Sequence, residues 1–540
     1  MNFTIKRIAA ASLVCILLIG MIACSEKNTP DNPGGGGNGT DTTSTPTDTT
    51  MVSTDTIQIT WSGASATVAG SHTGVEVTSK NGYVTVNSTV KDIAYLLSGT
   101  GQGQLTIYGT NRHLLILNNL SLSCSDGPAI NNQCKKSCFV ALVGTNSLTD
   151  GSTYATSDED RKAAFFSEGQ MIFSGAGSLT VKGNYKHAIA SDDYIQFTAG
   201  TGTLSLTAAA DGIHANDGVY FDGGTFAIAA EADGIQCDTA EIIVNEGAIT
   251  ITKAGDKGIT AYGDITINGG VIRISSEYKC IKAGKKENNK IVSAGNITIN
   301  GGDIQAICNG TSSGGGGGGP WGGGSSSDSS TPEAIEAKGT ITINGGYVYA
   351  YSSDDAINAA GDMTINDGFV MAHSTGNDGM DANGNLYIKG GLVYAISSRS
   401  PEMAIDANTE GGKKLYITGG TIIAVGDLES GASISGGTCK YTTSWTATSW
   451  YALYNGNTLV TAFKTPTKSS SGGGPGGGGP GGGGSSSQKL VVYTSSTPAL
   501  KSGVTVSGGT AIWNAMANPT ASVSGGSSVS LSNYSSNSGW

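Results

Sequence analysis

The chain has 540 residues and a formal net charge of −12, and glycine alone accounts for 84 positions. An acidic chain without a basic stripe of interleaved aromatic residues is not expected to bind nucleic acid. The five histidines are scattered along the sequence, and neither a Ser-His-Asp arrangement nor a histidine spacing typical of a metal site is apparent.

The N-terminal segment predicts export and lipid anchoring. Lys6 and Arg7 precede a mostly apolar run that ends at Cys24, which is typical of a secretory signal. We expect residues 1–23 to be a lipoprotein signal peptide and Cys24 to be the acylated first residue of the mature chain. Residues 24–56 would then be a flexible, lipid-anchored tether. Because no second long apolar run follows, the lipid alone would hold the protein at the bacterial outer membrane or cell surface.

Residues 57–430 are expected to form one domain built from a repeat of 22–25 residues. The repeat is regular from about residue 189, after an irregular β-rich stretch that would cap it. A period of this length, with apolar and polar residues alternating inside each copy, predicts an all-β solenoid. The widest spacing is attributed to one repeat plus a Gly-rich insertion at 308–332. The first aliphatic residue of each copy, used here as its anchor, is Ile189, Ile213, Ile235, Ile259, Ile281, Ile335, Ile357, Met380 or Ile405.

Two columns of residues predict how the repeats stack. The residue two positions after each anchor is almost always small, as at Ala215 and Ala261, which predicts a tightly packed interior. Cys237 and Cys280 fall at small-residue positions and are expected to be core thiols. A column of asparagines is expected at a turn that requires left-handed backbone, and its amides could also bond between repeats. These asparagines are Asn268, Asn300, Asn344 and Asn366.

Three further cysteines lie close together in the sequence. Cys124, Cys134 and Cys138 could form one disulfide in an oxidising compartment. A zinc site built on Cys134 and Cys138 would need two more ligands, and the sequence does not supply them.

Acidic residues recur two positions before and one position after the anchors. Carboxylates one repeat apart would repel one another by roughly 1 kcal/mol in water, so a cation is expected to offset the repulsion. Calcium suits such a set because it takes six to eight oxygen ligands. The alternative is that an Asp before Gly simply favours a tight turn and faces water. The predicted calcium ligands are Asp211, Asp233, Asp355, Asp378, Asp381 and Asp406.

Lysines and aromatic residues are the predicted sugar contacts. Lys279 and Lys282 lie between the two groups of acids and could contact a carboxylated sugar or simply neutralise their neighbours. Tyr347, Tyr349 and Tyr394 are predicted to point outward, where flat rings could stack on pyranose units. The alternative is that the C-terminal region covers this aromatic strip. That region, residues 431–540, has β character and a low-complexity insert at 468–487.

The chain resembles a family of secreted or surface-attached carbohydrate-binding proteins with a right-handed parallel β-helix, related to the pectate-lyase superfamily. The resemblance covers roughly residues 80–430 and rests on Tyr95-Leu-Leu-Ser-Gly99, Leu117-Asn-Asn-Leu120, Gly127-Pro-Ala-Ile-Asn131 and Leu142-Val-Gly-Thr-Asn-Ser-Leu-Thr-Asp150. It implies binding of plant cell-wall polysaccharide, pectic or cellulosic, together with calcium.

Two other functions stay open from the sequence. A calcium-dependent lyase acting by β-elimination would use Lys279 or Lys282 as its base. An adhesin or structural surface protein would need neither calcium nor sugar. The regular repeats and the lack of a catalytic constellation favour binding without cleavage.

Overall fold

The computed structural model describes residues 51–53, 55–288, 290–311, 331–399, 402–468, 488–507, 511–513, 516–517 and 521–535. The signal peptide, Cys24, the tether up to residue 50, most of the 308–332 insertion and nearly all of the 468–487 insert lie outside these residues. The described residues form strands, turns and loops without a helix, so no helical membrane span is found among them.

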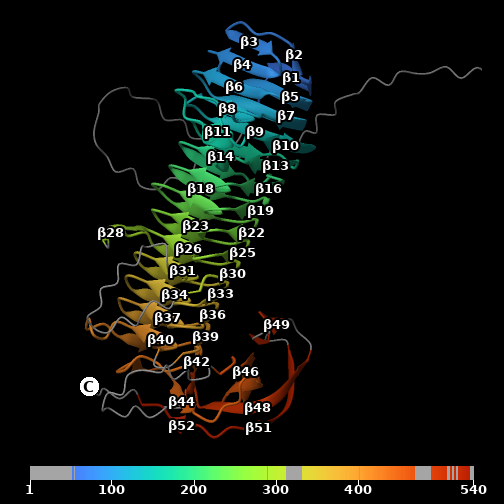
Figure 1. Ribbon diagram of the computed structural model, residues 1–540. Helices are drawn as coiled ribbons and strands as arrows, with labels where there is room; N and C mark the ends of the chain where they lie inside the picture. The colour runs from blue at the N-terminus through green and yellow to red at the C-terminus, as the bar shows by residue number, and fades with distance from the viewer. Residues whose placement is uncertain are drawn as a thin grey trace, which may run out of the picture. The chain divides into compact units, whose positions relative to one another are not determined.

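Most strands belong to two large, predominantly parallel sheets (Figure 1). The 14-stranded sheet takes one short strand from each regular repeat, in chain order. Its strands are β3 (Val75–Lys80), β4 (Tyr83–Ser88), β6 (Gln104–Gly109), β8 (Ile130–Asn132), β11 (Ala163–Ser167), β14 (His187–Ser191), β17 (Ile213–Ala215), β20 (Ile235–Cys237), β23 (Lys257–Ala261), β26 (Lys279–Ala283), β31 (Ile335–Ala337), β34 (Ile357–Ala359), β37 (Met380–Ala382) and β40 (Ile405–Ala407).

The 30-stranded sheet contains two parallel series that each take one strand per repeat. The first series is β9 (Cys138–Val143), β12 (Met171–Ser174), β15 (Tyr194–Phe197), β18 (Gly218–Phe221), β21 (Ile242–Val244), β24 (Ile265–Ile267), β29 (Ile297–Ile299), β32 (Ile341–Ile343), β35 (Met363–Ile365), β38 (Leu386–Ile388), β41 (Leu415–Ile417) and β43 (Ser433–Ile434). The second is β10 (Thr145–Thr149), β13 (Ser178–Gly183), β16 (Thr203–Ala208), β19 (Thr225–Ala230), β22 (Ala248–Ala254), β25 (Val271–Ser276), β30 (Asp303–Cys308), β33 (Tyr347–Ser352), β36 (Phe369–Ser374), β39 (Leu392–Ser397) and β42 (Thr421–Val425).

Antiparallel strands occur at both ends of this sheet. The remaining strands at its N-terminal end are β1 (Thr56–Gly63), β2 (Ser65–Ala69), β5 (Ile93–Gln102) and β7 (His113–Ser123). At the C-terminal end, β47 (Leu490–Thr494) pairs antiparallel with β42 and with β44 (Thr438–Thr442), which in turn pairs with β52 (Ser532–Asn533). An antiparallel partner occupies the backbone donors and acceptors of the last parallel strand, so the edge is paired.

Two small sheets complete the described structure. A hairpin of β27 (Lys285–Glu287) and β28 (Lys290–Ser293) follows β26 and projects from the large sheets (Figure 1). The spacing from Ile281 to Ile335 therefore includes this hairpin as well as the Gly-rich insertion. The six-stranded antiparallel sheet consists of β45 (Trp450–Asn455), β46 (Thr458–Lys464), β48 (Pro498–Ser507), β49 (Ala511–Ile512), β50 (Met516–Ala517) and β51 (Ser522–Ser528).

The predicted anchor column is confirmed by strand register. Ile213 is the pairing partner of Ile189 and of Ile235, and the same one-to-one register continues to Ile405. The anchors and the small residues two positions later are fully buried in one continuous core. Small residues are required there because the two large sheets face each other across this column at close-packed density.

The asparagine column is also confirmed as a ladder of amide hydrogen bonds. Asn300 donates from Nδ2 to Oδ1 of Asn268 at 2.7 Å, and Asn344 donates to Asn300 at 2.8 Å. The expected left-handed backbone is not found at these residues. It falls on the glycine two positions later, as at Gly302, whose φ is 92°. The turn needs a residue without a β-carbon there, so the asparagine is free to serve the ladder.

The cysteines of the described structure are buried and free. Cys237 and Cys280 lie in the core, as predicted. The disulfide considered for Cys124, Cys134 and Cys138 is not present, since all three are free thiols.

Candidate functional site

The outward face of the 14-stranded sheet carries a strip of charged side chains. In a three-residue strand such as β17, Ile213 and Ala215 point into the core, so His214 between them points to the opposite face. We call the residues two before and one after each anchor the charged strip. Its members are His187, Asp211, Asp233, Lys257, Lys279, Glu333, Asp355, Asp378 and Met403, with Ala190, His214, Gln236, Thr260, Lys282, Glu336, Asn358, Asp381 and Asp406.

The aspartates that lie two positions before an anchor are buried and hydrogen-bonded to backbone. Asp233 is 4% exposed, so the alternative in which these residues face water does not hold for it. One carboxylate oxygen accepts the backbone N–H at the same position of the next repeat, which satisfies a buried donor. The bonds run from the N–H of Asp233 to Asp211 at 2.9 Å, of Lys257 to Asp233 at 2.9 Å, of Asp378 to Asp355 at 3.1 Å and of Met403 to Asp378 at 2.5 Å.

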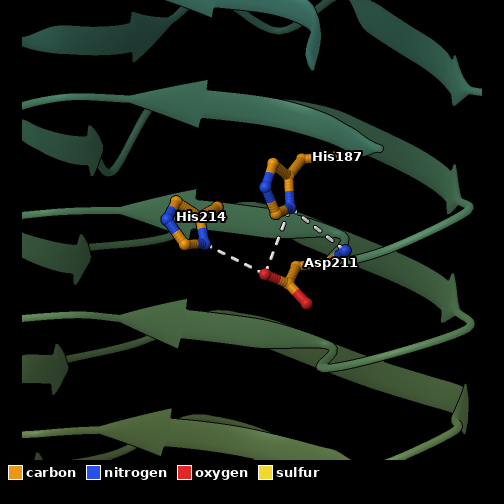
Figure 2. Close-up of side chains that lie close together, drawn as sticks. All are labelled: His187, Asp211 and His214. Carbon is orange, nitrogen blue, oxygen red and sulfur yellow. Dashed lines mark hydrogen bonds and ion pairs between the residues drawn. The ribbon is translucent and has the colours of Figure 1, made fainter. Parts of the chain in front are cut away.

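At the N-terminal end of the strip, two histidines converge on one carboxylate. His187 and His214 come from adjacent strands β14 and β17, and both rings point toward Asp211 (Figure 2). Oδ2 of Asp211 lies 3.1 Å from Nδ1 of His187 and 2.9 Å from Nδ1 of His214. The two imidazole rings stack with their centroids 4.3 Å apart. These three side chains are here called the histidine cluster.

The electrostatics of the histidine cluster favour a charged pair of Asp211 and His214. Burial by itself lowers the pKa of His214, but its bonds to Asp211 and Asp238 outweigh burial and raise the pKa to about 9. Burial raises the pKa of Asp211, and the two histidines reverse this and hold it below its ordinary value. Burial lowers the pKa of His187, whose Nδ1 accepts the backbone N–H of Asp211 at 3.2 Å. Asp211 and His214 therefore form the charged pair of the cluster, and His187 stacks on His214 beside it.

The middle of the strip opens into a depression of about 330 Å³ beside the β27–β28 hairpin. Lysines line it, so we call it the lysine pocket. Nζ of Lys285 lies 4.2 Å from the ring centroid of Tyr262, which fixes the ammonium group at the rim. Burial raises the pKa of Asp233 in its wall to about 7. The ionisable and aromatic lining residues are Lys257, Lys282, Lys285, Lys286, Asp211, Asp233, Asp256 and Tyr262.

Lys279 is sealed below the surface and does not fit the roles predicted for it. It has no exposed surface, and its ammonium group contacts Glu333, Oγ1 of Thr331 at 2.9 Å and Oε2 of Glu336 at 3.3 Å. Burial would lower its pKa, but the two glutamates outweigh burial and raise it. A lysine held in this way neither reaches a sugar nor accepts a proton near neutral pH. The prediction of Lys279 as a sugar contact or base is therefore wrong, whereas Lys282 does line the lysine pocket.

The C-terminal end of the strip is acidic. Asp355 and Asp378 are buried, and Asp381 pairs in register with Asp406 on the next strand. Burial, together with neighbouring carboxylates, raises the pKa of Asp378 to about 7 and that of Asp381 to about 6. Burial and a bond to Glu429 raise the pKa of Asp406 to about 9. Carboxyl groups are thus crowded in this part of the strip, here called the acidic end, and their ionisation is disfavoured.

The predicted aromatic residues lie on the 30-stranded sheet, away from the charged strip. Tyr394 is fully buried and donates from its hydroxyl to the carbonyl of Lys464 at 2.8 Å, so the prediction that it contacts sugar is wrong. Tyr349 stacks on Trp513 with centroids 5.3 Å apart. Tyr347 is 42% exposed, and its ring stacks on that of Phe369 with centroids 5.0 Å apart. The C-terminal sheet therefore covers much of this strip, as the alternative prediction held.

Sequence reasoning missed two features of the site. The histidines looked scattered because His187 lies two positions before one anchor, whereas His214 lies one position after the next. The alignment of the repeats places them on adjacent strands, but it does not show that their rings meet at Asp211. The lysine pocket was missed because Lys285 and Lys286 belong to a hairpin that interrupts the repeat.

The fold and the charged strip together define an all-β repeat protein with a lysine-lined depression on one sheet. A family model described as carbohydrate-binding domain-containing protein matches residues 80–379. This match spans more than half of the chain, and the protein therefore belongs to this family.

Two other comparisons provide less information about this chain. No curated protein matches the chain. A solved structure titled as the gadolinium derivative of the polysaccharide lyase-like protein from C. thermocellum is 20% identical to it. The alignment covers 47% of this chain and 95% of that one, with a TM-score of 0.33, and we base no argument on it.

Proposed function

We propose that this protein binds an acidic plant cell-wall polysaccharide, similar to polygalacturonate, and does not cleave it. The lysine pocket is the observation that carries the proposal. Four lysines gather there in a protein of net charge −12, which would otherwise repel a polyanion. The pocket volume lies at the lower end of the range for ligand sites, which suits a short stretch of sugar.

The surroundings of the pocket support recognition of uronate carboxylates. Lys285 and Lys286 lie on the projecting hairpin and are partly exposed, so their ammonium groups can meet an incoming carboxylate. Tyr262 and the lysine stems add apolar surface for a sugar ring. Lys279 is buried and cannot act as the base for β-elimination, and Lys282, the other predicted base, is only 4% exposed, so we expect binding alone.

A matched pair of variants on the hairpin tests this binding. We expect the double variant Lys285→Ala/Lys286→Ala to bind oligogalacturonate at least about tenfold more weakly in calorimetry, since each lost charge contact is worth about 1 kcal/mol. Lys290→Ala is the control, because Lys290 is exposed on the same hairpin but does not line the pocket. Unchanged affinity of the double variant, or equal binding of a neutral glucan, would contradict the proposal. A flat ultraviolet absorbance in the same sample is expected, since no unsaturated product forms.

We further propose calcium as the partner of the acidic end. Calcium prefers oxygen ligands, and a divalent cation would relieve the repulsion that raises the carboxyl pKa values there. Asp378 uses one oxygen for the backbone N–H of Met403, and the two oxygens of Asp355 accept the N–H of Asp378 and, at 2.8 Å, the side-chain amide of Asn358, which a cation would displace. The predicted pair of Asp211 and Asp233 fits calcium poorly, because two imidazoles flank Asp211. The proposed ligands are therefore Asp355, Asp378, Asp381 and Asp406, whose carboxylates would have to move closer together around the ion, because no three of them have ligand oxygens within 4.8 Å of one another in the described structure.

Calcium removal gives a separate test. We expect EDTA to lower the melting temperature and weaken oligogalacturonate binding, and added calcium to restore both. Asp381→Asn/Asp406→Asn should abolish the calcium response, while Lys285→Ala/Lys286→Ala should leave the calcium-dependent melting shift intact. If neither EDTA nor added calcium changed the melting temperature, the proposal that calcium binds at the acidic end would be wrong.

Two further expectations complete the proposed function. The in-register parallel pairing of three strands per repeat supports a right-handed parallel β-helix, and an experimental structure would establish its hand. We also propose display at the bacterial outer membrane or cell surface through a lipid on Cys24. Mass spectrometry of the mature N-terminal peptide would test the lipid directly.

A further inference from the structure

The histidine cluster has the chemistry of a transition-metal site. The ligand atoms of His187, Asp211 and His214 all lie within 4.8 Å of one another. No other three histidine, cysteine, aspartate or glutamate side chains meet this condition in the part of the chain that the structure describes. Two imidazoles and one carboxylate suit zinc and related borderline divalent ions, whereas calcium prefers oxygen donors. We propose that His187, Asp211 and His214 bind a divalent transition-metal ion such as zinc.

The spacing of the donor atoms fits this class of ion. Ligands about 2.0–2.1 Å from a tetrahedral zinc ion lie about 3.3 Å from one another. Oδ2 of Asp211 lies 3.1 Å from one histidine nitrogen and 2.9 Å from the other, so each of these two pairs needs to separate by only a few tenths of an ångström, and the ligand atoms of all three side chains lie within 4.8 Å of one another. The hydrogen bond from the Asp211 N–H to Nδ1 of His187 would be lost when that nitrogen binds the ion.

The residues behind the ligands hold them in place. Nε2 of His214 lies 3.4 Å from Oδ2 of Asp238, the arrangement in which a carboxylate orients a metal-binding imidazole. Oδ1 of Asp211 accepts the backbone N–H of Asp233 at 2.9 Å, which leaves Oδ2 facing the histidines. The side chains therefore converge without any rearrangement of strands (Figure 2).

The ion would keep an open coordination position. Three protein ligands leave a fourth position for water or for an oxygen of a bound molecule. Asp211 also lines the lysine pocket, so an ion on its carboxylate would lie at the margin of that pocket. The metal site does not depend on the proposed sugar binding and can be tested without any glycan.

Cobalt is a suitable probe because its visible absorption reports the ligands. The full chain, stripped of metal with EDTA and dialysed, should take up one equivalent of Co²⁺ and show visible bands without a thiolate charge-transfer band. His187→Gln and His214→Gln should each abolish these bands. Asp238→Asn removes no ligand, and we expect it to weaken Co²⁺ binding about 10–100-fold. His72→Gln is the control, since His72 is remote in sequence and pairs with Asp55 at 3.7 Å.

The outcomes separate metal binding from a purely hydrogen-bonded cluster. Zinc should displace cobalt, and a large excess of calcium should not. Absence of visible bands in the unmodified chain would overturn the proposal, as would thiolate bands or unchanged binding by both histidine variants. Far-ultraviolet circular dichroism of each variant shows whether the fold is kept, and the Asp238→Asn result tests the site even if a ligand variant unfolds.

Discussion

Asp233 illustrates how single residues of the charged strip serve both the backbone and the surface. Its carboxylate accepts the N–H of Lys257, and its pKa is raised to about 7 because it is buried. The hydrogen bond satisfies a donor that would otherwise be orphaned between repeats, while the charge itself is unfavourable there. The role of the oxygen atom can therefore be separated from the role of the charge.

Substitution of Asp233 tests this separation. We expect Asp233→Ala to lower the free energy of unfolding by about 1–3 kcal/mol, because the Lys257 N–H loses its acceptor. Asp233→Asn keeps an acceptor oxygen and should stay within about 1 kcal/mol of the unmodified protein. Urea denaturation at pH 8 in EDTA measures both. Equal losses for the two variants would show that the charge, rather than the acceptor, stabilises the fold.

The buried imidazole of His113 is expected to make the folded protein less stable at acid pH. It is 2% exposed, and burial lowers its pKa from 6.5 to about 4. Between these values the unfolded chain binds a proton that the folded chain does not, so stability falls as pH falls from about 6.5 to 4. Full protonation would cost about 3 kcal/mol. His113→Phe should show a smaller loss of stability over this window, whatever its stability at pH 8. If the free energy of unfolding fell equally with pH in the variant and in the unmodified protein, His113 would not be the source of this acid sensitivity.

At the scale of elements, the C-terminal sheet acts as a cover for the end of the aromatic strip. Phe463 on β46 is fully buried and contacts the Tyr394 ring edge-on, with centroids 5.4 Å apart. Met371, Leu392 and Ile396 belong to the same apolar cluster. This cluster is separate from the main core, so it can open without unfolding the repeats.

Phe463→Ala tests the cover. Removing a buried aromatic ring should cost about 3–5 kcal/mol and loosen the C-terminal sheet. Limited proteolysis should then cut within residues 445–530 while the repeats stay resistant. Tyr454→Ala is a suitable control, because Tyr454 is only half-buried on the adjacent β45. Uniform proteolysis of the whole chain would show that the sheet and the repeats unfold together.

At the scale of the whole molecule, each repeat is stabilised by its contacts with the repeats on either side. The parallel strands of the two large sheets pair with their equivalents one repeat away, so a defect should act locally. Ile259 is fully buried between Ile235 and Ile281. It is therefore a suitable position for a defect in the middle of the chain.

Ile259→Asp places a charge in the core, which costs several kcal/mol unless the site opens. We expect hydrogen exchange to show lost protection in β20, β23 and β26 and kept protection in β5 and β7. Val271→Asp is the control, because Val271 in the same repeat is 44% exposed. Loss of protection along the entire chain would mean that the repeats unfold as a single unit.

The sequence by itself determined the repeating part of this protein. The anchor column, the small-residue column and the asparagine ladder follow from period and alternation, because equivalent residues of parallel repeats must meet in register. The outward columns that contain Tyr347 and Tyr349 were placed correctly for the same reason.

Only the tertiary structure decided which residues form the site. His187 and His214 meet across an offset between two repeats, and Lys285 reaches the pocket from a hairpin outside the period. Tyr394 lost its expected exposure because β46, about 70 residues further along the chain, packs over it. Such contacts depend on how side chains lean across strands and on where distant elements fold back. A repeating sequence pattern does not contain this information. Its period determines which residues are neighbours in adjacent repeats, but it does not determine which segments cover or interrupt the repeats.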